Sequence, residues 1–429
     1  MRTERFRGAL LSALIVASLM ALAISLLSVS PSTAAPEGLT PRAPIYIYAN
    51  DGFILANGVV GGSGTENDPY IIENWDIDAS SDHGIIVRNT TAYFIIRNCY
   101  LHGDVANYGG ISFSNVTNGV LDNNLVKNNN YRGIWLVNSS NNTINNNIVK
   151  NTYYYGIRLD HSYTNLIINN IVENNGLGIF IHEHSDNNIV TNNVVGNNHD
   201  GISLNRSDNN LILNNLTRNN QNWGIHFYAS SNNIVENNIV ENHGQGGICL
   251  STSSENNRIS NNTVGNNYFN GIFLGWDSHN NRISNNLVRN NYDDGIQLDY
   301  HSDNNLIYHN NFVNNATQAI DSCSNYWDNG YPSGGNYWSD YSGADADNDG
   351  IGDTPYSIPR GNNQNRYPLM NPFVPPEEAL HIPTRWPLIA GIVGAVVMVS
   401  VATVFYIRKM RPKKVKRRRR RKRRRQARK

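Results

Sequence analysis

Short apolar strands recur along most of this chain at a nearly constant spacing. A glycine-isoleucine pair is followed by one variable residue and one apolar residue, and neighbouring copies lie 22 to 26 residues apart. The two apolar residues are two positions apart, so they share one face of a strand, and helical spacing is absent. The copies begin at Gly84, Gly110, Gly133, Gly156, Gly178, Gly201, Gly224, Gly247, Gly271 and Gly295, with a degenerate copy at Ala319.

An asparagine-rich unit lies between these copies, as in residues 233–242 and 281–290. A single repeat cannot bury its apolar face, but repeats stacked as turns of a solenoid form continuous internal columns of Ile, Leu and Val. Asparagine suits the corners because it tolerates the left-handed backbone region, and stacked asparagines can hydrogen-bond from coil to coil. We therefore predict an all-β fold, a right-handed parallel β-helix (solenoid) of about 11 coils over residues 44–325, roughly 50 Å long.

The two ends of such a stack need covering, because they expose unpaired sheet edges. Before the repeats comes a loop over residues 61–75 that enters a first strand, and after them comes an aromatic, glycine-rich segment over residues 326–341. We predict a C-terminal cap over residues 326–370.

The flanking segments predict export and membrane attachment. Residues 1–34 have the arginines, apolar run and small residues of a signal peptide, with an uncleaved anchor helix as the alternative. Residues 371–386 form a Pro-rich linker, and residues 387–407 form an uncharged transmembrane α-helix long enough to span the hydrocarbon. The polybasic tail, residues 408–429, then lies in the cytoplasm. We expect a single-pass protein of the cell membrane with an extracellular repeat domain.

The formal net charge of +1 averages regions of opposite sign. Of 35 Lys and Arg, 17 lie in the tail and three in residues 2–7, which leaves 15 against 33 of the 34 Asp and Glu, a central net charge of −18. An acidic body argues against nucleic acid as a partner of the repeat domain, because phosphate binding needs a basic surface. For the tail, anionic lipid is a simpler partner than nucleic acid. The three cysteines give no disulfide framework.

Three motifs resemble those of the NosD-like right-handed β-helix family, the periplasmic copper-binding type, and in particular its archaeal surface versions. They are the Gly-Thr-x-x-Asp-Pro-Tyr-Ile-Ile run at residues 64–72, the Ser-Gly-Gly-Asn-Tyr-Trp-Ser-Asp-Tyr run at 333–341, and residues 349–356. The resemblance covers roughly residues 44–367 and implies fold and location first. Copper delivery belongs to a small subset of the family, and no Met/His/Cys copper motif supports it here.

The variable positions two and four residues after each repeat glycine should point outward and stack from coil to coil. An outward stripe of aromatic, histidine and carboxylate side chains suits a sugar chain lying along the rod, with a varied solvent face as the alternative. We therefore expect a polysaccharide or surface glycan to bind along it. The candidate ligand-binding residues are Trp135, Asp160, Phe180, His182, Tyr228 and Phe273.

Two groups of carboxylates are candidates for other chemistry. Asp299 and Asp321 fall on adjacent coils at outward positions and are weak candidates for the acid and base pair of a glycosidase. Carboxylates at positions 1, 3, 5 and 9 of an acidic loop, with glycine at position 6, have the spacing that wraps a structural Ca²⁺, although a tyrosine stands at position 12; a hydrated turn is the alternative. These four are Asp345, Asp347, Asp349 and Asp353.

Histidines and glycosylation sequons complete the candidate sites. His182 and His184, with Glu183 between them and Asp160, His161 and His226 on neighbouring coils, could hold Zn²⁺ or Cu²⁺ if alternate residues shared a face. Because the required chemistry is not concentrated in any coil, we favour a non-enzymatic carbohydrate-binding or adhesion module. A surface polysaccharide hydrolase, lyase or epimerase is the first alternative, and metal binding or delivery is the second. Sequons begin at Asn89, Asn115, Asn138, Asn141, Asn205, Asn215, Asn261 and Asn315.

Overall fold

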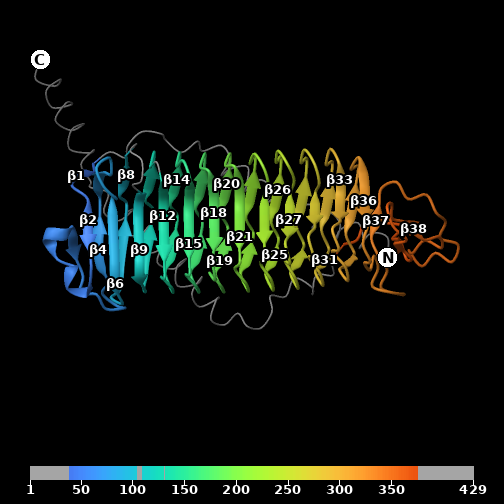
Figure 1. Ribbon diagram of the computed structural model, residues 1–429, viewed down its shortest axis with the longest axis horizontal. Coiled ribbons are helices and arrows are strands. Elements are labelled where there is room, and N and C mark those ends of the chain that lie inside the picture. The colour runs from blue at the N-terminus through green and yellow to red at the C-terminus, as the bar shows by residue number, and fades with distance from the viewer. Residues whose placement is uncertain (1–37, 104–108, 130, 375–429) are drawn as a thin grey trace, which may run out of the picture. The chain divides into compact units, whose positions relative to one another are not determined.

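The computed structural model describes residues 38–103, 109–129 and 131–374. Within these residues the chain winds as a right-handed parallel β-solenoid of about 11 turns, with three long sheets running along its axis (Figure 1). The expected solenoid is therefore confirmed. Among the described residues, no helix has the length and apolar character needed to cross a bilayer. The predicted signal peptide, transmembrane helix and polybasic tail, and all but the first four residues of the linker, lie outside the described residues.

Each turn contributes one strand to each sheet, because the next strand in the sheet lies one repeat later in the chain. Sheet A contains β1 (Thr40–Arg42), β5 (Trp75–Asp78), β8 (Tyr100–His102), β11 (Leu125–Lys127), β14 (Ile148–Lys150), β17 (Ile171–Glu173), β20 (Val194–Gly196), β23 (Leu216–Arg218), β26 (Ile239–Glu241), β29 (Thr263–Gly265), β32 (Leu287–Arg289), β35 (Asn311–Val313) and β37 (Tyr337–Trp338).

Sheet B holds the Gly-Ile-x-Leu strands, which are the longest. Its strands are β2 (Ile45–Ile47), β6 (Ile85–Thr90), β9 (Gly109–Val116), β12 (Arg132–Val137), β15 (Tyr155–Asp160), β18 (Leu177–His182), β21 (Asp200–Asn205), β24 (Ile225–Tyr228), β27 (Ile248–Ser251), β30 (Ile272–Leu274), β33 (Asp294–Leu298) and β36 (Thr317–Asp321).

Sheet C begins with an antiparallel pair, β3 (Val59–Gly61) and β4 (Tyr70–Glu73), which closes its N-terminal edge. Every later pairing in this sheet is parallel, through β7 (Phe94–Arg97), β10 (Gly119–Asp122), β13 (Thr143–Asn145), β16 (Leu166–Ile168), β19 (Ile189–Thr191), β22 (Leu211–Leu213), β25 (Ile234–Glu236), β28 (Arg258–Ser260), β31 (Arg282–Ser284) and β34 (Leu306–Tyr308). The end regions add the 3₁₀ turns η1 (Asn50–Gly52) and η2 (Leu55–Asn57) and the hairpin of β38 (Tyr356–Ser357) and β39 (Gln364–Asn365).

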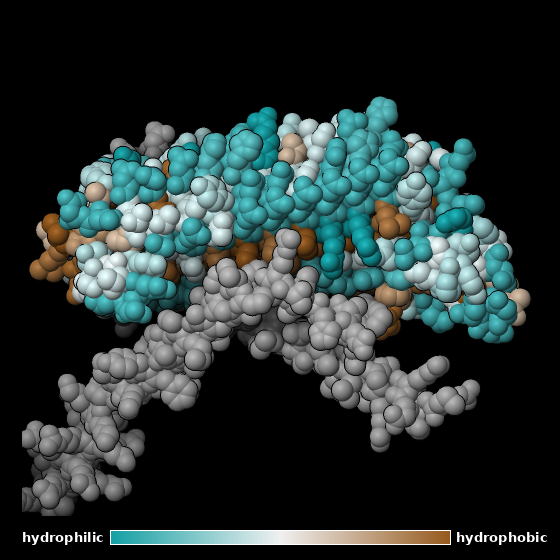
Figure 2. Space-filling model, turned by 90° about the horizontal axis from the view of Figure 1, so that it is seen from below, coloured by the Kyte–Doolittle hydropathy of each residue, from teal (hydrophilic) through white to brown (hydrophobic). Residues whose placement is uncertain are grey.

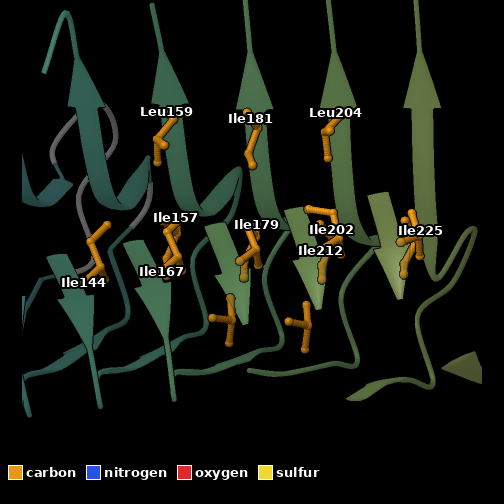
Figure 3. Close-up of a cluster of buried hydrophobic side chains, with 14 of the residues drawn as sticks. Ile144, Ile157, Leu159, Ile167, Ile179, Ile181, Ile202, Leu204, Ile212 and Ile225 are labelled. Carbon is orange, nitrogen blue, oxygen red and sulfur yellow. The ribbon is translucent and has the colours of Figure 1, made fainter. Parts of the chain in front are cut away.

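The core consists of aliphatic columns, as the period-two pattern predicts. Figure 3 shows Ile157, Ile179 and Ile202 in register on successive turns of sheet B, with Ile144 and Ile167 of sheet C beside them. All five side chains are fully buried. Burying each aliphatic side chain in such a column stabilises the fold by roughly 1.5–3 kcal/mol. A single repeat could not bury these side chains alone.

The asparagine pairs divide two tasks between their members. The first asparagine turns the corner in the left-handed region, as Asn237 does with φ of 58°. The second points inward, where its side chain joins a hydrogen-bonded ladder along the solenoid. The ladder between sheets C and A runs through Asn124, Asn147, Asn170, Asn193, Asn215, Asn238, Asn262, Asn286, Asn310, Asn336 and Asn365.

The outer surface differs from sheet to sheet. Figure 2, seen from below relative to Figure 1, shows an apolar band between hydrophilic regions. Outward residues of sheet C such as Ile189, Leu211 and Ile234 are only partly covered and supply aliphatic side chains. Aromatic, histidine and carboxylate groups instead gather on the outer face of sheet B.

Candidate functional site on the outer face of sheet B

The predicted ligand-binding residues lie on one surface, the outer face of sheet B, in two columns that follow its register. The first column runs through Trp135, Arg158, Phe180, Ser203, His226, Cys249, Phe273 and Gln297, and the second through Val137, Asp160, His182, Asn205, Tyr228 and Ser251. Their shared face follows from the period of two, but side-chain contacts sort them into two separate groups.

Asp160 is the centre of the first group. Its carboxylate accepts a bidentate pair of bonds from Arg158, both at 2.7 Å, a bond of 2.6 Å from the indole Nε1 of Trp135, and one of 2.8 Å from Nδ1 of His182. Burial opposes ionisation, but the hydrogen bonds from Arg158 first, then His182 and Trp135, hold the pKa of Asp160 below its usual value. Asp160 is therefore an ionised, fully engaged hub that orients its neighbours.

Arg132 lies beside this hub at the first position of β12. Its guanidinium carbon is 4.0 Å from the centre of the Tyr131 ring and 3.8 Å from that of Trp135, and Nη2 donates to the Tyr131 hydroxyl at 2.9 Å. Sequence reasoning missed Arg132 because it precedes the repeat glycine. We call Tyr131, Arg132, Trp135, Arg158, Asp160, Phe180 and His182 the arginine cluster.

The second group is a set of rings near the C-terminal turns. Trp223 stacks near Phe273 at 6.1 Å between ring centroids, Phe273 meets Trp276 edge-on at 5.5 Å, and Trp276 stacks on Tyr300 at 4.8 Å with only 3° between planes. Trp276 and Tyr300 remain 48% and 52% exposed, so they offer flat apolar surface to solvent. We call these four residues the aromatic platform. Tyr228, 40% exposed, has no ring contact with it among the described residues.

Glycine makes the platform possible, because the Trp223 ring must extend over the backbone of the next turn to reach Phe273. A Cβ at Gly246 would lie 2.2 Å from the Trp223 ring, and a Cβ at Gly275 would lie 2.6 Å from the Phe273 ring. Both rings thus rest on bare backbone. Two sequence signals mark the platform. Trp223 lies opposite a glycine on the next turn, Gly246, and Phe273 lies two residues before a glycine in its own turn, Gly275.

A hollow of about 590 Å³ opens beside the platform. Tyr300 forms one wall, and Asp299, Asp303, Ser322 and Asn363 supply polar groups. Asp299 accepts hydrogen bonds from the Ser322 hydroxyl at 2.6 Å and from the backbone N–H of Tyr300 at 2.9 Å. An aromatic wall with hydroxyl, amide and carboxylate groups around it can stack on a sugar ring and bond its hydroxyls.

The prediction that Asp321 faces outward beside Asp299 is wrong. Asp321 pairs in register with the inward Leu298 and is completely buried. Its carboxylate accepts bonds from Trp327 Nε1 at 2.8 Å and from Asn325 Nδ2, while burial raises its pKa to about 6. In the repeat pattern of the sequence, Ala319 aligns with the repeat glycines. In the structure, it occupies the core position that Ile296 holds on the preceding turn. The two carboxylates consequently lie on opposite faces of the sheet.

The acidic loop brings three of its four predicted ligands together. Carboxylate oxygens of Asp345, Asp347 and Asp349 lie within 4.8 Å of one another. Asp353 instead accepts a bond from the backbone N–H of Ala346 at 2.8 Å.

Calcium binding by this loop stays a prediction. Millimolar Ca²⁺ should raise the thermal midpoint of the wild type by about one to two degrees and leave Asp347→Asn unchanged, because exposed loops of this type bind calcium at about 10⁻⁴–10⁻³ M. Asp277→Asn is the control. An identical Ca²⁺ response in Asp347→Asn would mean that the loop is only a hydrated turn.

The histidines do not form the candidate metal cluster, and the alternative, surface histidines separated by a bend in the strand, agrees with the structure. Glu183 and His184 both have left-handed backbones, with φ of 47° and 53°, so His184 turns away from His182. His184 instead lies near His161, at 6.2 Å between ring centroids, while His182 stays with Asp160. Within the described ranges, only the aspartate loop groups three potential metal ligands.

Six of the eight sequon asparagines fall into two structural classes, while Asn205 and Asn261 are partly exposed. Asn89, Asn115, Asn138 and Asn141 are exposed at corners, whereas Asn215 and Asn315 are buried members of ladders. Glycosylation therefore stays a prediction, and it is sterically compatible with the native fold at the corners.

Two family models match overlapping parts of the chain. Residues 181–343 match the family described as periplasmic copper-binding protein (NosD), and residues 47–195 match the right-handed beta helix region. No curated protein matches the chain significantly. Among solved structures, similarity is found to the A-module of the mannuronan C-5 epimerase AlgE6 of Azotobacter vinelandii, with 16% identity over 67% of this chain and 87% of that one and a TM-score of 0.49.

Two further solved structures are similar at lower scores. The Dettilon tailspike protein shares 15% identity over 57% of this chain and 59% of its own, with a TM-score of 0.43. The periplasmic alginate epimerase AlgG shares 14% identity over 67% of this chain and 84% of its own, with a TM-score of 0.42.

Proposed function

Because this chain is a NosD-like right-handed β-helix repeat protein, we propose that it is a non-enzymatic glycan-binding protein of the cell surface. Its binding surface is the outer face of sheet B. Attachment to the membrane comes from the uncharged segment 387–407 and the basic tail that follows it. The Pro-rich linker holds the repeat domain away from the bilayer.

The observation that carries the proposal is the aromatic platform beside the polar hollow. Trp276 and Tyr300 present stacked, half-exposed rings, and Asp299 and Asp303 line the adjoining hollow. Rings supply apolar contact for the faces of a sugar, and carboxylates accept bonds from its hydroxyls. The carboxyl pair suggested for hydrolysis, Asp299 and Asp321, does not support it, because a glycosidase needs both groups to face one substrate and Asp321 faces the core.

One experiment tests binding and attachment together. The full chain is incorporated into phosphatidylglycerol-containing vesicles, and fluorescent oligosaccharides identified on a glycan array are sedimented with them. We expect the sugar to pellet with the vesicles and to remain uncleaved. Trp276→Ala should weaken binding about tenfold, because it removes a stacking surface worth roughly 1.4 kcal/mol.

Tyr163→Ala is the matched control, since Tyr163 is 54% exposed and outside the platform. Equal losses in the two variants would show that the platform is not the binding surface. Shortened sugar products would establish an enzyme in place of a binding protein. If the sugar stays in the supernatant even when the vesicles carry the wild-type protein, the proposed function is refuted.

A further inference from the structure

We propose that Arg132 forms a carboxylate subsite, so that the glycan bound by this face is an acidic polysaccharide containing uronate sugars. This inference rests on the proposed function and names its substrate class. It arises from the arginine cluster, which the aromatic platform does not require.

The two arginines of the cluster differ in how their charge is balanced. Arg158 is neutralised by the bidentate bonds to Asp160. Arg132, by contrast, has no ion pair with any carboxylate in residues 38–103, 109–129 and 131–374. The only described hydrogen bond of its side chain goes to the Tyr131 hydroxyl, and its Nε is buried without a partner. The cluster therefore contains one positive charge that the described residues leave uncompensated.

The local environment makes that charge a receptor for an anion. Burial first, and the charge of Arg158 as well, lower the pKa of Arg132, so a nearby anion would relieve an unfavourable interaction. The guanidinium lies over the rings of Tyr131 and Trp135. Apart from the Nη2 bond to Tyr131, the terminal N–H groups of Arg132 have no partner among the described residues, and a guanidinium can bind a planar carboxylate with two parallel bonds.

Charge is unevenly distributed along the outer face of sheet B, and this favours binding of the acid groups of the glycan at one end of the face. In the N-terminal turns of this face, Arg88 and Arg132 carry positive charge beyond the neutral pair of Arg158 and Asp160, while the C-terminal turns carry Asp294 and Asp299. From β12 to β33 there are seven steps between neighbouring strands, which at about 4.8 Å each is about 34 Å. Acid groups of a long glycan would thus be favoured at the arginine cluster and disfavoured at the hollow.

The test uses two ligands that differ only in the charged group. Binding of the full chain in detergent to oligogalacturonate is compared with binding to the same oligomer after reduction of its carboxyl groups. We expect the wild type to prefer the uronate form by roughly ten- to a hundredfold, the range for a hydrogen bond to a charged group. Arg132→Gln should lose this preference and leave the affinity for the reduced oligomer unchanged.

Arg282→Gln is the matched control. Arg282 also lies over a ring, 4.9 Å from that of Tyr308, and has no ion pair among the described residues, but it belongs to sheet C. The control should keep the full preference. Arg132→Lys retains the positive charge but lacks the planar guanidinium, so it should keep part of the preference for the uronate oligomer. This result would support the inference even if the glutamine variant folds poorly.

The outcomes separate this inference from the proposed function. Equal binding of the two oligomers by the wild type would overturn the carboxylate subsite and leave the glycan surface intact. Binding of a sulfated oligosaccharide in preference to the uronate would overturn the assignment to carboxylate. Failure to bind any sugar would refute both.

Discussion

Replacing Asn238 with alanine is expected to lower the free energy of unfolding by about 4 kcal/mol, although the change removes only one small side chain. The two N–H groups of the Asn238 amide are shared among three acceptors, the carbonyls of Ile212 and Glu236 and Oδ1 of Asn262. Its own Oδ1 accepts two bonds from Asn215, from the backbone N–H at 2.8 Å and from the side chain at 3.1 Å. Alanine would leave these buried groups unsatisfied on two adjoining turns, which costs far more than the lost contacts themselves.

The neighbouring asparagine provides the control. Asn237 is exposed and turns the corner with φ of 58°, a conformation that glycine adopts freely. Asn237→Gly should therefore cost less than about 1 kcal/mol. Urea unfolding followed by circular dichroism measures both variants. Similar losses at positions 237 and 238 would show that the ladder contributes no more than the corner does.

The contrast between these two positions shows how far the sequence specifies the fold. The repeated Asn-Asn pair predicts both a left-handed corner and a ladder, and both are observed. It does not say which member does which, because the answer depends on where the backbone points after the corner. The Gly-Ile-x-Leu unit is more informative, because a period of two assigns Ile157 and Leu159 inward and Arg158 and Asp160 outward without further information.

The errors occur where the repeat loses its signature. In β36, Gln318 occupies the position held by glycine elsewhere and Ala319 that of the isoleucine. A shift of one residue turns every side chain to the other face, and this shift moved Asp321 from the predicted surface into the core. Only the pairing of β36 with β33 resolves the register, and pairing is a long-range property.

The candidate site was predicted in part for a related reason. Trp135, Asp160 and His182 follow from alternation, but their mutual hydrogen bonds depend on rotamers that span two turns. Arg132 and Trp223 each lie immediately before the repeat glycine, Arg132 at the first position of β12 and Trp223 two residues before β24, so the Gly-Ile-x-Leu pattern does not include them. Trp276 comes from a left-handed corner with φ of 54°, which no period-two pattern contains. Residues at strand ends and corners therefore need the structure to place them.

His243 stands in a ladder where other turns have asparagine, and it predicts a pronounced dependence of stability on pH. Its Nδ1 accepts a bond from the backbone N–H of Asn220, so the proton lies on Nε2, which donates to the Thr217 hydroxyl at 3.1 Å. Burial lowers the pKa of His243 to about 3. Thr217 is itself buried in a column that holds valine on both neighbouring turns, Val195 and Val240. The pair is thus a neutral polar insertion in an apolar core.

The sign of the effect follows from the direction of this shift. Histidine in the unfolded chain has a pKa of about 6.5 and takes up a proton as the pH falls, whereas buried His243 stays neutral until about pH 3. The contribution of His243 to the free energy of unfolding is complete above about pH 6.5 and is lost progressively as the pH falls below that value. Between pH 7 and pH 4 the wild type should lose roughly 3 kcal/mol through this residue alone.

A double variant isolates this contribution, because other groups titrate in the same interval. Thr217→Val together with His243→Asn restores the pairing found on neighbouring turns and leaves no hydroxyl without a partner. The free energies of unfolding obtained from urea titrations at pH 7 and pH 4 should then differ by about 3 kcal/mol less in the double variant than in the wild type. His161→Asn, at an exposed corner, should retain the wild-type difference. If the double variant and the wild type lose the same stability on acidification, then His243 is not the group that makes the solenoid sensitive to acid.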